Sequence, residues 1–537
     1  MRNSQGLLEL VQKLTEIGVA LSAEKDEGKL LELILRGARE ITGADGGTLY
    51  WRTDSDALEF AIMFTESLGI HLGGTSGKAV DLPPLPLFAE DGSPNLKMVA
   101  ANAAVTGKTV NVVDTYADDG DFDFSGTRTF DEKTGYRSRS LLAVPMRNHD
   151  DEVIGVLQLL NAKDAPGGDS RPFTAEEERL VTSLASQAAI AMTNRRLIEE
   201  QRELFEAFIQ LIAAAIDDKS PYTGGHCRRV PELTMMLADA AARSELGSLS
   251  NFSMTEEERY ELYIAGWLHD CGKVTTPEHV VDKATKLNTI FDRIELVDLR
   301  FDVLRERAQV DHLQGMLDTP AESHGEAKTK LQAALTELDE EQAFIRRFNL
   351  GGEFMPEEAK ERVRAIGLRP MPSGSATSTL LTDDEVYNLC ISRGTLTQEE
   401  REVINNHIVA TIKMLESLPY PKHLRRVPEF AGGHHERMDG NGYPRGLVRE
   451  EMSIQARVMG IADIFEALTA GDRPYKKAMT LSQALTILGR MKEDNHVDPE
   501  LFDVFVREKV YLDYANEFLA PEQIDDVDLS AIPGYLY

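Results

Sequence analysis

Apolar and polar residues follow three different patterns along the chain. From about residue 24 to 170, a helical stretch is followed by short runs rich in β-branched residues and bounded by Gly, Asp and Asn. These runs are GGTLYWR, LEFAIMF, KTVNVVD, RSLLAVPMRN and EVIGVLQLLNAKD. Runs of this kind predict strands. We therefore expect an α+β module in which an antiparallel sheet has helices on one side.

The second pattern is a long helical one. The sequence RPFTAEEERLVTSLASQAAIAMTNRRLIEEQRELFEAFIQLIAAAIDD has an apolar residue at every third or fourth position, no Gly, and no Pro after Pro172. An uninterrupted pattern of this length between domains predicts a coiled-coil connector, which is commonly dimeric. The alternative is two shorter helices that fold into the flanking domains.

The third pattern is helical and starts after residue 218, where strand signals almost vanish, and it continues to about residue 515. Within it, residues 288 to 370 contain two charged amphipathic helices around a DTPAESHG turn, which predicts a helical hairpin. The following stretch, GLRPMPSGSATSTLLTDDE, is rich in Pro, Ser and Thr and is predicted to be a loop. Three roles are open for this insertion: docking of a protein partner, extension of a dimer, or cover over an active site.

The length of 537 residues exceeds a single hydrophobic core and favours several domains. We expect four parts. They are an α+β domain at 1–174, a helical connector at 175–214, a helical domain at 215–515 with an insertion at about 288–393, and a C-terminal tail at 516–537.

Composition and charge exclude several classes of partner. No run approaches the roughly 18 consecutive apolar residues of a membrane span. The net charge of −32 argues against binding to a nucleic acid polymer or an anionic lipid surface. The three cysteines, Cys227, Cys271 and Cys390, are too widely spaced for a disulfide framework or a zinc ribbon, so a reducing cytoplasm is the expected location.

The helical domain contains a histidine next to an aspartate. In GWLHDCGK, His269 and Asp270 follow an apolar helical segment, and Lys273 comes three residues after the aspartate. Residues three apart share one face of a helix, so Lys273 is expected beside Asp270. Taken alone, a buried His-Asp pair is usually structural.

Five more candidate ligands follow in the same domain. They are His226 in YTGGHCRRV, His407 in EREVINNHIVATIKML, His434 and His435 in GGHHERMDGNGYP, and Asp463 in MGIADIFEALTAGDRPYKK. A carboxylate in an apolar helix is costly unless it is paired or binds metal. Seven ligands are too many for one tetrahedral zinc but suit two metal ions that share a bridging carboxylate.

Such a pair of ions, about 3.5–4 Å apart, favours hydrolysis of a phosphate ester. The overall acidic chain then needs local cations for the substrate phosphates, and the candidates are Lys273, Arg445, Arg473 and Lys476. The alternative for each is ordinary surface charge. The Gly-Asn-Gly-Tyr-Pro run after His435 is expected to let the backbone approach the site closely.

The ordered set of His226, HDCGK, His407, HHERMDGNGYPRGL and ADIFEALTAGDRPYKK resembles the HD-GYP family, a branch of the HD phosphohydrolases that degrades cyclic di-GMP. The resemblance covers roughly residues 215 to 288 and 394 to 515. The predicted helical hairpin and loop interrupt the resemblance and lie outside the compact family domain. The resemblance implies an all-α domain and hydrolysis of cyclic di-GMP to linear pGpG, with GMP as a further product.

The resemblance also implies roles for individual residues. One metal ion would be held by His226, His269 and Asp463, the other by His407, His434 and His435, with Asp270 as the bridge. Lys273 would contact the scissile phosphate, and Arg473 and Lys476 the other substrate phosphates. The Gly442-Tyr443-Pro444 signature is intact, and iron or manganese would be the metal.

Two departures from the family pattern bear on the number of metal ions. Members with a third ion resemble one another in an acidic residue four positions before the first histidine, where this chain has Tyr222. The helix of Asp463 has Glu466 where Asp is usual. We therefore expect two ions.

The N-terminal module resembles a GAF domain of the cyclic-nucleotide-binding kind, in TGKTVNVVDTYADDGDFDF, TGYRSRSLLAVPMRN and VIGVLQLLNAKD. Asn161, Lys163, Phe173 and Glu177 approach the signature of that subgroup, although Ala162 separates the first two. The resemblance implies a cyclic nucleotide as ligand. The alternative is a GAF fold that serves only in dimerisation.

Together these features predict a cytoplasmic, dimeric phosphodiesterase in which a GAF sensor and a long helix precede the catalytic domain. Two alternatives stay open. The substrate could be another cyclic dinucleotide such as cyclic GMP-AMP, or the chain could be a receptor or scaffold that binds a dinucleotide without turnover.

Overall fold

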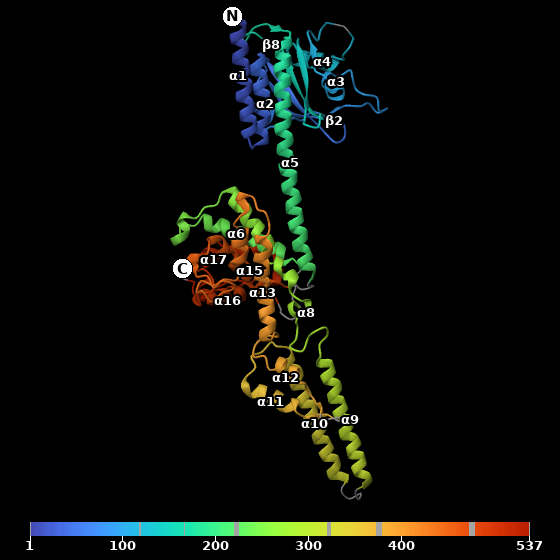
Figure 1. Ribbon diagram of the computed structural model, residues 1–537, viewed down its shortest axis with the longest axis vertical. Helices are drawn as coiled ribbons and strands as arrows, with labels where there is room; N and C mark the ends of the chain where they lie inside the picture. Colours follow the sequence, from blue (N-terminus) through green and yellow to red (C-terminus); the bar gives the residue numbers. More distant parts are fainter. Residues whose placement is uncertain are drawn as a thin grey trace. The chain divides into compact units, whose positions relative to one another are not determined.

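The computed structural model describes residues 2–117, 120–165, 167–219, 225–318, 324–371, 378–471 and 478–535 (Figure 1). The chain divides into two compact units, Met1–Leu204 and Phe205–Tyr537. Each unit is described by itself below.

The first unit is built on an antiparallel sheet of order β3-β2-β1-β7-β6-β5, with β4 paired to β2. The strands are β1 (Gly46–Arg52), β2 (Ala57–Thr65), β3 (Ile70–Gly73), β4 (Leu85–Pro86), β5 (Val110–Val112), β6 (Leu141–Arg147) and β7 (Val153–Leu160), and a separate pair is formed by β8 (Ala162–Lys163) and β9 (Ser170–Arg171). The helices are α1 (Arg2–Ala23), α2 (Glu27–Thr42), α3 (Val99–Thr106), α4 (Ser125–Thr134) and the start of α5 (Ala175–Lys219).

Helices cover both faces of this sheet, so the expectation of helices on one side was wrong (Figure 1). In β6, Leu142 and Val144 pack in the cluster formed with α1, α2 and α5, whereas Leu141 and Ala143 pack with α3 on the other face. Every residue from Leu141 to Met146 is consequently buried. Continuous apolar runs such as LLAVPM are typical of strands that are covered twice, whereas alternation marks a strand with one solvated face.

Asn161, the first residue of the GAF-like signature, is buried at φ 55° between β7 and β8. Its side-chain oxygen accepts the backbone N–H groups of Arg139 and Ser140, and its amide donates to the Tyr136 hydroxyl and the Arg137 carbonyl. All four contacts lie within the domain. Asn161 therefore fixes the turn that leads into β6.

The other signature residues are also engaged inside the unit. Lys163 pairs with the buried Asp45 at 2.7 Å, which ties β8 to the turn before β1. Phe173 lies in the hydrophobic core, and Glu177 near the start of α5 pairs with Arg171 at 2.6 Å. These residues hold the fold together through their own contacts, and the GAF ligand stays a prediction.

Helix α5 is a single helix of 45 residues, so the alternative of two shorter helices was wrong. The boundary between the two units falls within it. Its exposed apolar residues include Ile190, Leu197, Leu204 and Leu211, which recur every seven positions. A repeat of seven is typical of a coiled-coil seam.

The second unit is mostly helical. Its main part contains α6 (His226–Ala242), α7 (Glu256–Leu268), α8 (Glu278–Val281), α13 (Gln398–Glu416), α14 (Val427–Gly432), α15 (Ile454–Thr469), α16 (Leu481–Glu493), α17 (Pro499–Arg507) and α18 (Val510–Phe518). Short 3-10 turns are η1 (Gly247–Asn251), η2 (Cys271–Thr275), η4 (Lys422–Leu424), η5 (Arg449–Glu451), η6 (Pro521–Gln523) and η7 (Leu529–Ala531).

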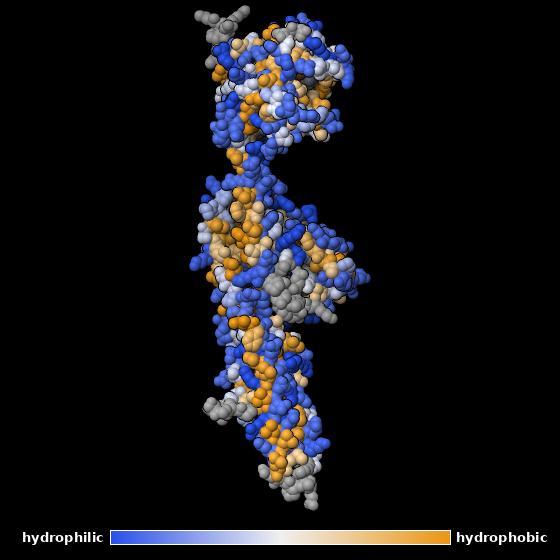
Figure 2. Space-filling model, turned by 90° about the vertical axis from the view of Figure 1, so that its right-hand side faces the viewer, coloured by the Kyte–Doolittle hydropathy of each residue, from blue (hydrophilic) through white to orange (hydrophobic). Residues whose placement is uncertain are grey.

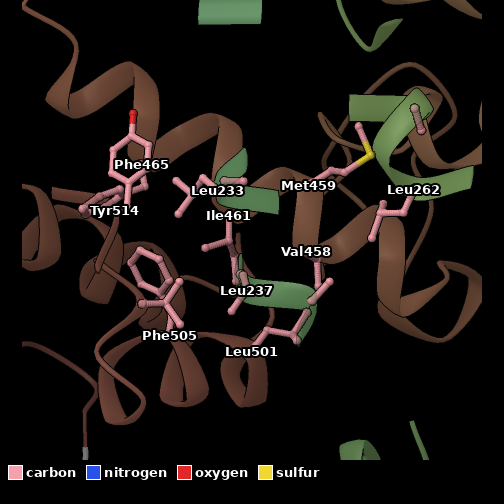
Figure 3. Close-up of a cluster of buried hydrophobic side chains, with 14 of the residues drawn as sticks. Leu233, Leu237, Leu262, Val458, Met459, Ile461, Phe465, Leu501, Phe505 and Tyr514 are labelled. Atoms are coloured by element: carbon pink, nitrogen blue, oxygen red, sulfur yellow. The ribbon is translucent and has the colours of Figure 1, made fainter. Parts of the chain in front are cut away.

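The core of this part surrounds α15. Figure 3 shows Ile461 and Phe465 of α15 among Leu233 of α6, Phe505 of α17 and Tyr514 of α18. All five side chains are fully buried. Close packing of this kind leaves little freedom to the helix. It therefore fixes the position of any functional residue on the other faces of α15.

The insertion contains the expected helical hairpin, formed by α9 (Ile294–Asp318) and α10 (His324–Asn349). It also contains α11 (Glu357–Gly367), α12 (Asp383–Leu389) and a strand pair, β10 (Pro370–Met371) with β11 (Ser378–Thr379). The stretch predicted as a loop contains both of these strands and the start of α12; residues 372–377 lie outside the described residues. These elements have a hydrophobic cluster of their own.

Among the described residues, no helix combines the length and the apolarity that a membrane crossing requires. Cys227, Cys271 and Cys390 are all free thiols, as their spacing predicts.

Candidate metal centre

The second unit brings seven histidines and aspartates together in two overlapping groups. In each group, one potential ligand atom from every residue lies within 4.8 Å of the others. The groups are His226, His269, Asp270 and Asp463, and Asp270, His407, His434 and His435. Asp270 belongs to both, which is the arrangement that a bridging carboxylate requires.

The His-Asp pair is placed by a change of helix type. Helix α7 ends at Leu268, and the chain continues through His269 and Asp270 into the 3-10 turn η2. A Cβ atom on Gly272 would lie 2.0 Å from the carbonyl oxygen of His407, so only glycine allows this approach to α13. The N–H of Gly272 also donates to the Thr411 hydroxyl at 2.9 Å. Gly272 thereby brings Asp270 and His407 together.

The adjacent histidines lie in a turn that closes on itself. The buried Glu436 accepts the backbone N–H groups of Arg445 and Leu447 at 2.7 and 2.9 Å. A Cβ atom on Gly442 would lie 2.3 Å from the backbone nitrogen of Arg437, so the loop folds this tightly only with glycine there. The expected close backbone approach is therefore an approach of the loop to itself.

Tyr443 follows Gly442 and orients one of the histidines. Its ring stacks on the ring of His435, with centroids 4.8 Å apart and an angle of 21° between the planes. The Gly-Tyr-Pro segment thus positions His435 through packing.

Hydrogen bonds from the imidazole rings to backbone carbonyls determine which ring nitrogen carries the proton. A carbonyl oxygen only accepts, so a ring nitrogen bonded to it must carry the proton, and the other nitrogen keeps its lone pair. In three histidines, Nδ1 donates to the carbonyl three residues earlier, namely His269 to Gly266, His407 to Ile404 and His434 to Ala431. Their Nε2 atoms are left as ligands, which is the usual arrangement for histidines that bind metal.

Two buried atoms of the centre test whether a metal ion fits. Asp270 Oδ1 and His434 Nε2 are buried and make no hydrogen bond within the described residues. Buried polar atoms are rarely left without a partner, because desolvation then goes uncompensated. In addition, His226 Nε2 and His269 Nε2 lie 3.3 Å apart. A divalent cation would coordinate all of these lone pairs. The side chains present therefore fit a metal site.

Charge differs between the two ligand groups. Burial alone would raise the pKa of Asp270, but Lys273 and His269 hold it well below its ordinary value. Burial lowers the pKa of His434 well below its ordinary value and that of His435 to about 4, so this group has the neutral imidazoles that bind metal. Burial acts in the same direction on His226 and His269, but neighbouring carboxylates raise the pKa of His226 well above its ordinary value and that of His269 to about 9. A metal ion in the first group would therefore have to displace protons.

Glu466 contacts a histidine of the first ligand group, on the ring nitrogen that does not face the centre. Its carboxylate accepts a hydrogen bond from His226 Nδ1 and pairs with Arg229, whose Nη2 lies 2.6 Å away. The side chain is fully buried. The sequence showed only that glutamate replaces an expected aspartate. Its position three residues after Asp463 on an apolar helix was the available signal for a role at the centre.

We expect Glu466→Gln to weaken metal binding by about tenfold or more, in line with the 10–100-fold effects of residues that orient metal ligands. The near-isosteric amide removes the charge that fixes the His226 ring. Competition with a chelator measures the affinity. Glu385→Gln is the control, because Glu385 is equally buried and pairs with Arg300 in the insertion. Equal affinities in the two variants would contradict the role of Glu466.

The four basic side chains predicted to contact the substrate phosphates differ in their positions. Lys273 Nζ lies 2.5 Å from Asp270 Oδ2, so this ammonium is at the centre as expected. The guanidinium of Arg445 lies 3.5 Å from Glu416 and is half-exposed. Arg473 and Lys476 lie outside the described residues, as does Tyr222.

Comparison with protein families identifies the parts of the chain. Residues 26–192 match the GAF domain, and residues 223–343 and 379–501 each match a model of the HD domain. All seven ligand residues lie within the two HD matches. The chain therefore combines a GAF domain with a helical HD region.

One similar protein is a 3'3'-cGAMP-specific phosphodiesterase of Vibrio cholerae, which is 42% identical over 20% of this chain and 23% of the relative. Another is a cyclic di-GMP phosphodiesterase of Pseudomonas aeruginosa, which is 38% identical over 21% of this chain and 26% of the relative. The chain thus spans about a quarter of the length of these relatives. Among solved structures, the GAF domain of a phosphoenolpyruvate-protein phosphotransferase from Coxiella burnetii is 15% identical with a TM-score of 0.28, over 36% of this chain and 98% of that chain.

Proposed function

We propose that this chain is a metal-dependent phosphodiesterase that hydrolyses a cyclic dinucleotide, with cyclic di-GMP as substrate and linear pGpG, then GMP, as products. The observation that carries the proposal is the convergence of seven ligands on two groups that share Asp270. When bound, two divalent ions make hydroxide available near neutral pH and neutralise the charge that develops on the phosphate.

The residues of the chain then have distinct tasks. Asp270 and the six other ligands hold the ions in place, and Tyr443 keeps the ring of His435 oriented. Lys273 presents a positive charge beside Asp270, and its side chain is 28% exposed, so it can reach a phosphate oxygen of a bound substrate. Arg445, Arg473 and Lys476 are further candidates for contacts with the substrate phosphates.

Two metal ions fit the supporting residues better than three. The carboxylate of Glu466, in the position where the family usually has aspartate, is already engaged by His226 and Arg229. Each of its two oxygens already has a partner, which makes it a poorer ligand for a third cation. Iron or manganese suits the mixed set of imidazoles and carboxylates.

The choice of dinucleotide needs a direct comparison, because similar proteins carry the names of both cyclic di-GMP and 3'3'-cGAMP phosphodiesterases. Iron- or manganese-loaded protein, prepared without oxygen, is incubated with each dinucleotide, and the products are separated by chromatography. Faster formation of pGpG supports the proposal. Faster turnover of 3'3'-cGAMP would make that dinucleotide the substrate instead of cyclic di-GMP. If both dinucleotides stay intact although metal is bound, the result would favour a non-catalytic receptor.

We further propose that the GAF domain binds a cyclic nucleotide and regulates the HD region through α5, which also pairs two chains. The last turn of α5 contacts the backbone of two segments that lie next to residues of the metal centre. Lys219 Nζ donates to the carbonyls of Val274 and Thr276, each at 2.6 Å, directly after Lys273. Asp217 accepts the N–H groups of Gly225 and Cys227, which flank His226. Calorimetry on residues 1–195 with cyclic AMP, cyclic GMP and cyclic di-GMP tests the ligand, and absence of heat would exclude all three.

Replacing Lys219 with methionine tests the coupling. The variant loses the hydrogen bonds to η2 but keeps the length of the side chain, so we expect any effect of a GAF ligand on kcat to shrink several-fold, while metal binding stays unchanged. Lys492→Met is the control, since Lys492 likewise donates to a carbonyl, that of Gly534, but contacts no part of α5 in the described structure. If both variants keep the full ligand effect, the coupling does not pass through Lys219.

A further inference from the structure

Helix α9 carries apolar residues on two opposite faces. One face packs in the insertion, where Val297 and Phe301 are fully buried. The other face is exposed, and Figure 2 shows hydrophobic residues gathered along this hairpin. The exposed residues are Leu296, Leu299, Val303, Val310, Leu313 and Leu317, between 38% and 87% exposed. A row of this kind on a single helix indicates an interface.

The exposed residues of α9 follow a heptad pattern. The steps from 296 to 317 alternate between three and four residues, and only Glu306 interrupts the apolar series. In heptad notation the a positions are Leu296, Val303, Val310 and Leu317, and the d positions are Leu299, Glu306 and Leu313. This is the seam of a coiled coil.

We propose that α9 pairs in parallel with α9 of a second copy of this chain. Valine occupies the two central a positions, Val303 and Val310, and leucine the d positions on either side, Leu299 and Leu313. Among parallel coiled coils, β-branched residues at a with leucine at d favour two strands over three or four. The composition of the seam thus fits a pair of identical helices.

Charged residues beside the seam support the same direction. Asp302 is a g position and Arg307 is the e position of the next heptad, and both are more than half exposed. In a parallel pair, g of one helix faces e of the next heptad on the other, so Asp302 meets Arg307 of the second copy twice. An antiparallel pair would bring Arg307 towards its own counterpart. Both residues now pair within α9, and exposed pairs of that kind are worth little, so they exchange readily.

The pairing is weak by itself. Three heptads are near the lower limit for stable helices in water, and two Glu306 side chains would face each other in the seam. Contacts elsewhere that hold two chains together raise the effective concentration of α9 and would make the pair form. The surface does not depend on hydrolytic activity.

Disulfide crosslinking in the full chain tests the proposal. Cys390→Ser is made in every variant, because the two other natural cysteines are buried. Leu299→Cys and Leu313→Cys are introduced separately, and each protein is oxidised mildly and run on a non-reducing gel. Asp311→Cys is the matched control, since residue 311 is exposed but lies at a b position, away from the a and d seam.

In a parallel pair in register, both Leu299→Cys and Leu313→Cys give covalent dimers, and Asp311→Cys gives at least tenfold less. Adding Glu306→Leu raises the rate of crosslinking. An antiparallel pair would link at most one of the two positions to itself and would overturn the proposed direction. Absence of links at both positions, with the helical circular dichroism of the wild type retained, would overturn self-pairing.

Discussion

Replacement of Asp270 by asparagine is expected to lower kcat by about 10³-fold or more, and to lower the affinity for metal as well. The amide has the same shape but lacks the charge that both ligand groups use. Paired ions supply several kcal/mol of transition-state stabilisation, and each ~1.4 kcal/mol corresponds to a factor of ten in rate. Product chromatography gives the rate, and metal analysis of the same sample gives the ion content.

Asp498→Asn is the control for this variant. Asp498 is fully buried in the same unit and pairs with Arg449 and Arg457, but it belongs to neither ligand group. We expect its folded fraction to keep metal and turnover. If Asp270→Asn retains both at the level of this control, Asp270 does not bridge two ions.

The second large effect is expected from Lys273→Met, with a loss of about 10²-fold or more in kcat, the size seen when one group that stabilises transition-state charge is removed. The ammonium of Lys273 lies beside Asp270, and its side chain is partly exposed. Lys273 is not itself a metal ligand. Metal content should therefore stay near that of the wild type, which separates this variant from Asp270→Asn.

Lys283→Met serves as the control for Lys273→Met. Lys283 is a buried lysine that likewise pairs with a carboxylate, Glu400 at 2.7 Å, outside the ligand groups. Wild-type kcat in Lys273→Met would exclude contact between this lysine and the reacting phosphate. Loss of metal together with rate would instead make Lys273 a residue that stabilises the charge of Asp270.

The sequence was most informative where one local pattern determines the outcome. The run GGTLYWR coincides with β1, and the long apolar repeat after Pro172 is a single helix. The candidate ligands were visible because histidine and aspartate are uncommon on apolar backgrounds. The structure brings all seven together, although they come from five separate segments of the chain.

Features that depend on contacts between segments far apart in the chain could not be predicted from the sequence. The run LLAVPM does not say whether its strand is covered once or twice, and β6 has helices over both faces. Glu466 could be noticed on the helix of Asp463, but its bonds to His226 and Arg229 join residues more than 230 positions apart. Gly272 likewise shows its importance only against the backbone of α13.

The exposed seam of α9 is a case in which the pattern was present but mixed with another. The inner and outer apolar faces together make the helix apolar at about half of its positions, so the heptad series emerges only after the buried residues Val297 and Phe301 are assigned to the inner face. Solvent exposure, which the sequence does not give, separates the two.

The central claim, a centre of two metal ions that share Asp270, is tested most directly by adding manganese stepwise to metal-free protein under anaerobic conditions while the rate of pGpG formation is measured. We predict little turnover at one equivalent per chain and a maximum at about two. Full activity at one equivalent, or a maximum that requires three, would contradict the account.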